Sequence, residues 1–143
     1  MTAPPVLCRI EFWVPGNPAP QGSKKHVGRG IMIESSKALG PWRERVAVFA
    51  HQAMKQAGAR PFTGPVTLRM DFIMPRPTSA SKTKVLPATK RPDCDKLARS
   101  IGDAVTAICF VDDSQVVDLR ATKRVALFGE PSGVQITVSG PTV

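Results

Sequence analysis

Residues 91–119 of the chain have the sequence RPDCDKLARSIGDAVTAICFVDDSQVVDL. Pro92 and Asp93 open this stretch, and aspartate is a common N-cap residue of helices. Apolar residues then recur at the three- and four-residue spacing of one helical face. We therefore predict a helix that is capped by Asp93 and extends to about residue 108. Its apolar stripe consists of Leu97, Ile101, Ala104, Val105 and Ile108, and Lys96, Arg99, Ser100 and Asp103 face away from that stripe.

Two pairs of aspartates flank this predicted helix. Asp93 and Asp95 lie at its start, where the positive end of the helix dipole favours ionised carboxylates. Asp112 and Asp113 follow its far end, about 20 Å away at 1.5 Å per residue. Both pairs could reach one metal ion only if the chain returns along a neighbouring strand or a partner molecule supplies one pair. The alternative is purely structural: Asp93 caps the helix, Asp95 pairs with Arg99, and Asp112 and Asp113 form a polar turn.

The segments around this helix predict an α+β fold. Alternation of apolar and polar residues, which is typical of half-buried strands, is clearest in residues 65–74. We predict further strands over residues 7–14, 115–127 and 134–140, and a second helix over residues 41–57. There is no internal repeat. The sequence thus predicts one compact domain, residues 1–143, with a mixed β-sheet and two main helices.

Charge is distributed unevenly along the chain. The net charge is +9, yet the segment from Asp93 to Asp118 holds six aspartates and only two basic residues, a local charge of −4. The rest of the chain therefore carries +13. Carboxylate oxygens are the ligands that hard divalent cations prefer, and a basic surface attracts polyanions. The balance predicts a phosphate-attracting surface around a site for a divalent cation, although an acidic solvated helix face would give the same local charge.

Two basic segments without any acidic residue are candidate DNA contacts. The first is the Pro- and Gly-rich stretch after the first strand, and the second is the loop of residues 76–92, which is longer than most connections in compact domains. The predicted DNA-binding residues are Lys24, Lys25, Arg29, Lys82, Lys84, Lys90 and Arg91.

Composition excludes several classes of protein. Apolar residues make up 42% of the chain, but no stretch approaches the ~20 uninterrupted apolar residues of a membrane span. The first residues lack the pattern of a signal peptide, so we expect a cytoplasmic protein. Three cysteines, Cys8, Cys94 and Cys109, have no metal-site spacing, and buried free thiols are expected.

The stretch quoted above resembles the RusA-type Holliday junction resolvases, in which an Asp-x-Asp pair opens a helix and an Asp-Asp-x-Gln-Val-Val segment follows it. The resemblance extends more loosely over most of the chain. It implies a homodimeric, Mg²⁺-dependent endonuclease of mixed α and β structure that cuts branched DNA near the crossover, with Mn²⁺ able to replace Mg²⁺. It also implies action in a bacterial cytoplasm, that of the host if a phage encodes the protein.

The same resemblance assigns roles to individual residues. Asp93, Asp95 and Asp113 match the metal-binding catalytic carboxylates, and Asp112 is a further ligand or a support for the site. Arg99 stands where the family has a catalytic lysine, and Lys96 replaces the usual asparagine. Arginine and lysine are not equivalent at a tight phosphate site, so either Lys96 or Arg99 is the catalytic cation, and position favours Arg99.

This residue set suits phosphodiester hydrolysis. Carboxylate-bound Mg²⁺ can activate water, neutralise developing charge and stabilise the leaving oxygen. Two symmetric nicks in a junction call for two sites, which a twofold dimer provides. Two other functions stay open at this point. One is a nuclease of the same fold that prefers flaps or forks, and the other is a non-catalytic DNA-binding accessory of replication or recombination.

Overall fold

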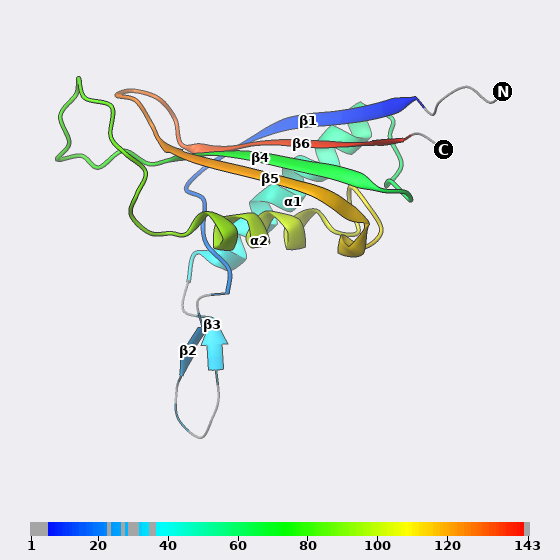
Figure 1. Cartoon of the computed structure of the whole chain (residues 1–143), viewed down its shortest axis with the longest axis horizontal. Coiled ribbons are helices and arrows are strands. Elements are labelled where there is room, and N and C mark those ends of the chain that lie inside the picture. Colours follow the sequence, from blue (N-terminus) through cyan, green and yellow to red (C-terminus); the bar gives the residue numbers. More distant parts are fainter. Residues whose placement is uncertain (1–5, 23, 27, 29–31, 35–36, 142–143) are drawn as a thin grey trace.

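The computed structural model describes residues 6–22, 24–26, 28, 32–34 and 37–141. Figure 1 shows four long strands side by side, two helices beneath them, and a small hairpin that lies away from the sheet. The elements are β1 (Leu7–Pro15), β2 (Lys24–His26), β3 (Met32–Glu34), α1 (Leu39–Gln56), β4 (Val66–Met74), α2 (Cys94–Val105), the short 3₁₀ helix η1 (Asp113–Gln115), β5 (Val116–Val125) and β6 (Gly133–Pro141).

The four long strands form one mixed sheet in the order β1-β6-β4-β5. Strand β6 is antiparallel to both of its neighbours, whereas β4 and β5 run parallel. A parallel pair cannot be joined by a tight turn, so the chain crosses from the end of β4 to the start of β5 through the 75–92 loop, α2 and η1. The predicted α+β class with a mixed sheet and two main helices is confirmed.

One face of the sheet is buried beneath α1 and α2, and the other is open. Alternate residues of the strands point to the helices, which is the period expected of a half-buried sheet. Together with the apolar stripes of the two helices they form a single hydrophobic cluster. Its least exposed members include Val14, Val46, Leu68, Met70, Phe72, Leu97, Ile101, Val105, Val134, Ile136 and Val138.

The open face carries several ion pairs. They join residues two apart on the same strand: Arg9 with Glu11, Arg69 with Asp71, and Arg120 with Asp118. Asp118 thus belongs to this face and lies outside any site between the sheet and α2. Within the described part of the chain, no helix is long and apolar enough to cross a membrane.

Helix α2 is shorter than predicted. It ends at Val105 instead of near residue 108, because Thr106 adopts extended backbone angles and Ala107 has a φ of 70°. The Thr106 hydroxyl also donates to the Gly102 carbonyl at 2.7 Å and satisfies the helix end. Ser100 was expected to face away from the core, and this is wrong. It is fully buried, because its hydroxyl donates to the Leu97 carbonyl at 2.7 Å and needs no solvent.

All three cysteines are free. Cys109 is fully buried, and burial raises the pKa of its thiol to about 12, so it stays protonated. Cys8 and Cys94 are only half-buried, which corrects the expectation that all three thiols lie in the core.

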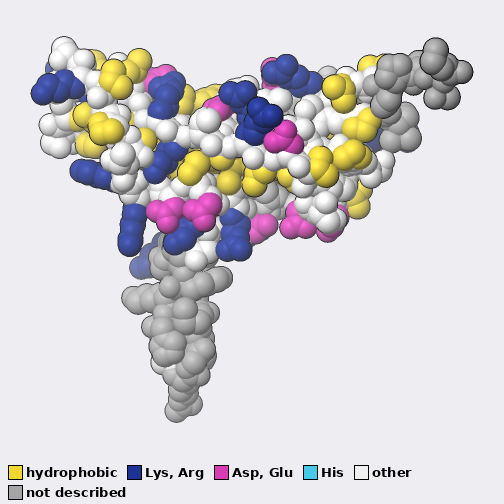
Figure 2. All heavy atoms as spheres, in the orientation of Figure 1, with side chains coloured by type: hydrophobic (Ala, Val, Ile, Leu, Met, Phe, Trp, Pro, Cys, Tyr) yellow, Lys and Arg dark blue, Asp and Glu magenta, His cyan; other side chains and the backbone are white. Residues whose placement is uncertain are grey.

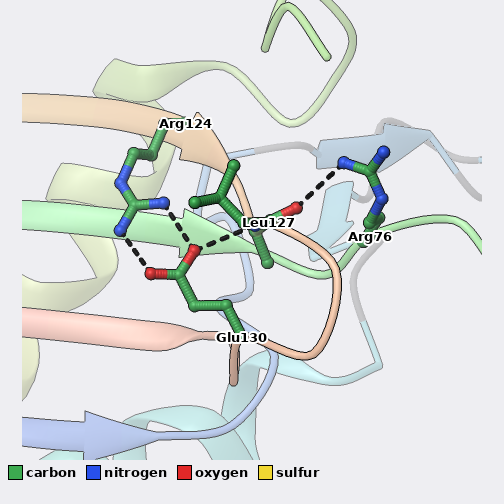
Figure 3. Close-up of polar contacts among 5 residues, drawn as sticks. Arg76, Arg124, Leu127 and Glu130 are labelled. Atoms are coloured by element: carbon green, nitrogen blue, oxygen red, sulfur yellow. Dashed lines mark hydrogen bonds and ion pairs between the residues drawn. The ribbon is translucent and has the colours of Figure 1, made fainter. Parts of the chain in front are cut away.

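A cluster of polar contacts braces the turn between β5 and β6, residues 126–132 (Figure 3). Arg124 donates two hydrogen bonds to the Glu130 carboxylate, at 2.6 and 2.7 Å. The same carboxylate accepts from the Leu127 backbone at 2.9 Å. Arg76, from the loop after β4, donates to the Ala126 carbonyl at 3.2 Å and so ties the two loops together. The hydrogen bonds from Arg124 are the main reason that the pKa of Glu130 falls to about 2.

We expect these contacts to make the unfolding free energy depend on pH in the acidic range. Because the pKa of Glu130 is lowered on folding, its carboxylate stabilises the folded state above pH 4.5, the ordinary value for glutamate, and that contribution disappears as pH falls towards 2. Urea unfolding should therefore show a difference between wild type and Glu130→Gln that is constant near neutral pH and shrinks in acid. Arg124→Gln should remove the same pH dependence. A difference that persists unchanged at pH 2.5 would contradict this account.

Candidate active site

A cleft of about 470 Å³ runs between α2 and β5. Three charged residues of α2 spaced four apart, Asp95, Arg99 and Asp103, line its helical wall, as the i, i+4 geometry of a helix dictates. Asp113 of η1 lines it as well. The remaining lining residues are Leu68, Lys96, Ala98, Gly102, Val116 and Leu119.

The start of α2 presents two carboxylates that make no capping hydrogen bond to the helix. Asp93 occupies the N-cap position with extended backbone angles, but its side chain makes no capping hydrogen bond. Its side chain is 55% exposed, and its carboxylate lies 3.8 Å from the Lys96 ammonium. The Asp95 carboxylate forms no ion pair or hydrogen bond with any described residue, so the predicted alternative of an Asp95–Arg99 pair is not observed. Both carboxylates are available to a ligand.

Lys123 holds the backbone that leads into these aspartates. It lies on β5 opposite Phe72, on the face of the sheet that the helices cover. Its ammonium donates to the carbonyls of Lys90 and Pro92, at 2.9 and 2.8 Å. Pro92 immediately precedes Asp93, and Lys90 lies three residues before it. Sequence analysis missed this residue, although a lysine on the inward face of a strand is an unusual feature that could have indicated it.

Gln115 fixes the other end of the site. Its side-chain amide donates to the carbonyls of Phe62 and Gly64, both at 2.8 Å, and its oxygen accepts from the Asp112 backbone at 2.8 Å. The Asp112 carboxylate in turn accepts from the backbone and hydroxyl of Ser114, which completes a capping box around η1. The hydrogen bond from the Ser114 hydroxyl is the largest cause of the lowered pKa of Asp112. Asp112 is therefore committed to the turn, and Asp113 is the member of the pair that lines the cleft.

The chain after β1 closes the cleft beside Arg99. The Gln21 backbone donates to the Lys96 carbonyl at 3.0 Å, and the Gln21 side chain donates to the Asp103 carboxylate. Gly22 has a φ of 98°, and a Cβ there would lie 2.8 Å from the Arg99 guanidinium. The positive φ favours glycine at this position, and any other side chain would displace the Arg99 guanidinium. Neither Asp103 nor Gln21 was among the predicted site residues, although the spacing of Asp95, Arg99 and Asp103 indicates one shared helical face.

The sequence matches the family described as Endodeoxyribonuclease RusA over residues 15–139, which is nearly the whole chain. The protein belongs to the RusA endodeoxyribonuclease family. It is also 29% identical over 141 residues to the uncharacterized protein YqaN of Bacillus subtilis (strain 168), a match that covers 90% of this chain and 94% of that protein. Membership places the protein among DNA-cleaving enzymes.

The aspartates that match the RusA metal ligands fall into two groups. Figure 1 shows η1, in gold, beside the C-terminal end of α2, and Figure 2 shows acidic side chains over the start of α2 and again towards η1. Among the residues that the structure describes, no three His, Cys, Asp or Glu side chains are grouped closely enough to hold a metal ion. One chain thus brings Asp95 and Asp113 to the same cleft without joining Asp93, Asp95 and Asp113 into one cluster.

This arrangement fits Mg²⁺ better than a cation that needs an all-protein cage. Mg²⁺ keeps several water ligands and is often held by one or two carboxylates together with substrate phosphates. The paired carboxylates at the start of α2 are of that kind. Asp93 and Asp95 would hold the ion, and Lys96 and Arg99 lie on the same turns of the helix.

The structure describes some of the predicted DNA-binding residues more fully than others. Four of them are exposed on the loop before α2: Lys82, Lys84, Lys90 and Arg91. Arg76 anchors this loop by donating to the carbonyls of Ser81 and Lys84. Lys24 and Lys25 lie on β2, where the structure describes the backbone, and Arg29 lies outside the described residues.

We expect the hydrogen bonds of Lys123 to stabilise the backbone that leads into the site. Replacing it by methionine keeps most of the side-chain volume but leaves two carbonyls without their charged donor, and this should cost about 1 to 2 kcal/mol of unfolding free energy. Urea denaturation measures the change. Lys55→Met, at an exposed position of α1, is the control and should change stability by less than about 0.5 kcal/mol. Equal unfolding free energies of the two variants would show that the contact of Lys123 does not stabilise the folded protein.

Proposed function

We propose that this protein is a Mg²⁺-dependent, homodimeric endonuclease that resolves four-way DNA junctions. The observation that carries the proposal is the start of α2, where two carboxylates that do not cap the helix lie beside two cations, one of them paired with Asp93, and next to a basic loop. Membership of the RusA endodeoxyribonuclease family supports the cleavage of DNA. The choice of junctions rests on the resemblance of residues 91–119 to the RusA-type resolvases.

The residues of the site divide the chemistry among them. Mg²⁺, when bound, supplies the Lewis acidity that activates water and stabilises the departing oxygen. Asp93 and Asp95 would hold the ion at the positive end of α2. Arg99, or Lys96, neutralises charge on the phosphate in the transition state, and the fork of arginine suits two phosphate oxygens at once. The loop lysines bind neighbouring phosphates and position the DNA without selecting a sequence.

Two features support a dimer. Asp93 and Asp95 lie at the start of α2, whereas Asp113 belongs to η1, which lies beside the other end of that helix, so a second copy could bring its own Asp113 to the first copy's aspartates. Strand β5 is also an edge strand with exposed apolar side chains beside the cleft: Val117 is 71% exposed and Leu119 is 57% exposed. Exposed apolar residues on a sheet edge are unfavourable unless something covers them. A twofold dimer through this edge would cover them and would align two sites for paired nicks.

The metal ligands are tested by single replacements. Asp93→Asn, Asp95→Asn and Asp113→Asn should each abolish Mg²⁺-dependent cleavage of a synthetic four-way junction while leaving junction binding nearly unchanged, because the basic surface is intact. Asp112→Asn should be milder, since that carboxylate caps η1. Cleavage gels with Mg²⁺ or EDTA and binding gels in EDTA give both readouts. Full cleavage by Asp95→Asn would falsify the assignment, and preferential cutting of flaps or forks would redirect the substrate class.

A mixing experiment tests whether the site is shared between two copies. In a dimer of one Asp95→Asn chain and one Asp113→Asn chain, a shared arrangement puts both changes in one site and leaves the other site intact. Each variant alone is inactive, but the mixture should then nick one strand of the junction. Nicking activity that fails to appear after subunit exchange would assign all three aspartates to the same chain.

Arg99 and Lys96 are compared directly. Loss of a charge that acts mainly in the transition state should slow cleavage by roughly 10²- to 10³-fold with little effect on affinity. We expect this of Arg99→Ala, whose guanidinium lines the cleft, and a smaller effect of Lys96→Ala, whose ammonium faces Asp93. Single-turnover cleavage at saturating protein measures both rates. The reverse order would assign the catalytic cation to Lys96.

A further inference from the structure

The braced turn between β5 and β6 presents apolar side chains to solvent. Phe128 is 62% exposed and Leu127 is 50% exposed at its tip. Exposed apolar side chains that are scattered singly are normal, but these two are adjacent and lie on backbone that is held at several points. The contacts of Arg124, Glu130 and Arg76 described above fix it (Figure 3). The Ala126 backbone also donates to the Met74 carbonyl at 2.9 Å. A rigid turn therefore displays an aromatic ring that contributes little to the core.

The surroundings of Phe128 suit a nucleic acid. The Lys82 ammonium lies over one face of the Phe128 ring, 5.1 Å from its centre, so a base would stack on the other face. The loop that carries Lys82 has basic residues and no acidic ones. A hollow of about 320 Å³ between the two loops is lined by both residues. Figure 2 shows basic and hydrophobic side chains mixed at this end of the molecule. An aromatic ring next to a cation is the arrangement that binds a base and its phosphate together.

The turn also lies at the end of the sheet that is closest to Asp93 and Asp95 along the loop into α2. Strands β4 and β5 end there, and the loop after β4 leads from there into α2. Lys123 of β5 pins that loop just before Asp93. The turn, the basic loop and the first aspartates are thus linked by direct contacts. A DNA strand that crosses the loop towards the aspartates passes this turn.

We infer that Phe128, with Lys82 beside it, forms a stacking site for an unpaired nucleobase of the branched DNA. This inference rests on the proposed function and deepens it, because bases are unpaired or easily unpaired where duplex arms meet. The ring would stack on the base, and the ammonium would bind the adjoining phosphate. Fully paired duplex has no base to offer, so the site would contribute to preference for branched or single-stranded DNA over duplex.

The test measures binding in EDTA by fluorescence anisotropy with three labelled DNAs: a four-way junction, a duplex of the same arm sequence and a single-stranded thymidine oligonucleotide. Stacking of one base on an aromatic side chain corresponds to about 5- to 150-fold in affinity. Phe128→Ala should weaken binding of the junction and the single strand within that range and leave duplex binding unchanged. Phe128→Leu, which stays apolar but has no aromatic face, should behave like alanine, and Phe128→Trp should bind as wild type.

A direct contact is sought by photo-crosslinking a junction with 5-iododeoxyuridine at the branch point, followed by mass spectrometry of the adduct. A crosslink at Phe128 is expected. Val48→Ala, an equally simple truncation of a 52% exposed side chain on α1, is the control and should change no affinity. Thermal unfolding should be the same for all variants, because Phe128 lies outside the core.

The outcomes separate this inference from the proposed function. Unchanged binding of all three DNAs by Phe128→Ala, or an equal loss on duplex, overturns the stacking site. If wild type neither prefers nor cuts junctions, the resolvase proposal fails, and the single-stranded arm still decides whether Phe128 stacks on a base. A wild-type protein that binds neither junction nor single strand overturns both.

Discussion

The parallel pairing of β4 and β5 is the constraint on which the rest of the molecule depends. Parallel neighbours begin at the same end of the sheet, so the chain must travel the length of the sheet between them. Helix α2 makes that return and buries its apolar stripe beneath the strands. As a result the segment before α2 and the turn after β5 meet at one end, and η1 lies at the other. The cleft between α2 and β5 follows directly from this crossover.

The same crossover decides how far the acidic segment can act as a unit. Six aspartates that are close in sequence are divided among different tasks. Asp118 is in an ion pair on the open face, Asp112 caps η1, and Asp103 accepts from Gln21. Asp93 and Asp95 share the start of α2, where Asp93 pairs with Lys96 and Asp95 has no partner among the described residues, and Asp113 lies on η1 beyond the other end of the helix. The local negative charge of the sequence indicated where a cation could bind. The fold then determines which of these carboxylates are engaged in other contacts and which can bind the cation.

Much of this architecture could be predicted from the residue pattern, and the reasons for the exceptions are physical. Alternation located the strands, and the stripe from Leu97 to Val105 located α2, because burial on one face imposes a period. The end of α2 could not be predicted, since Ile108 continues the apolar period while Thr106 leaves the helix. The contacts of Lys123 and Gln115 were also missed. They join positions more than 30 residues apart in the chain, and no local pattern reports such a pairing. The elements were thus accessible from sequence, whereas the contacts that hold the site were not.

The paired charges on the open face of the sheet have a consequence for how the molecule meets DNA. Arg9, Arg69, Arg120 and Arg124 are matched one for one by acidic partners, so this whole face adds nothing to a net charge of +9. The net positive charge therefore lies outside this face of the sheet, and the electric field around the protein is asymmetric. A polyanion approaching from afar would exert a torque as well as an attraction. Diffusional encounters would then begin with the neutral face already turned away from the DNA.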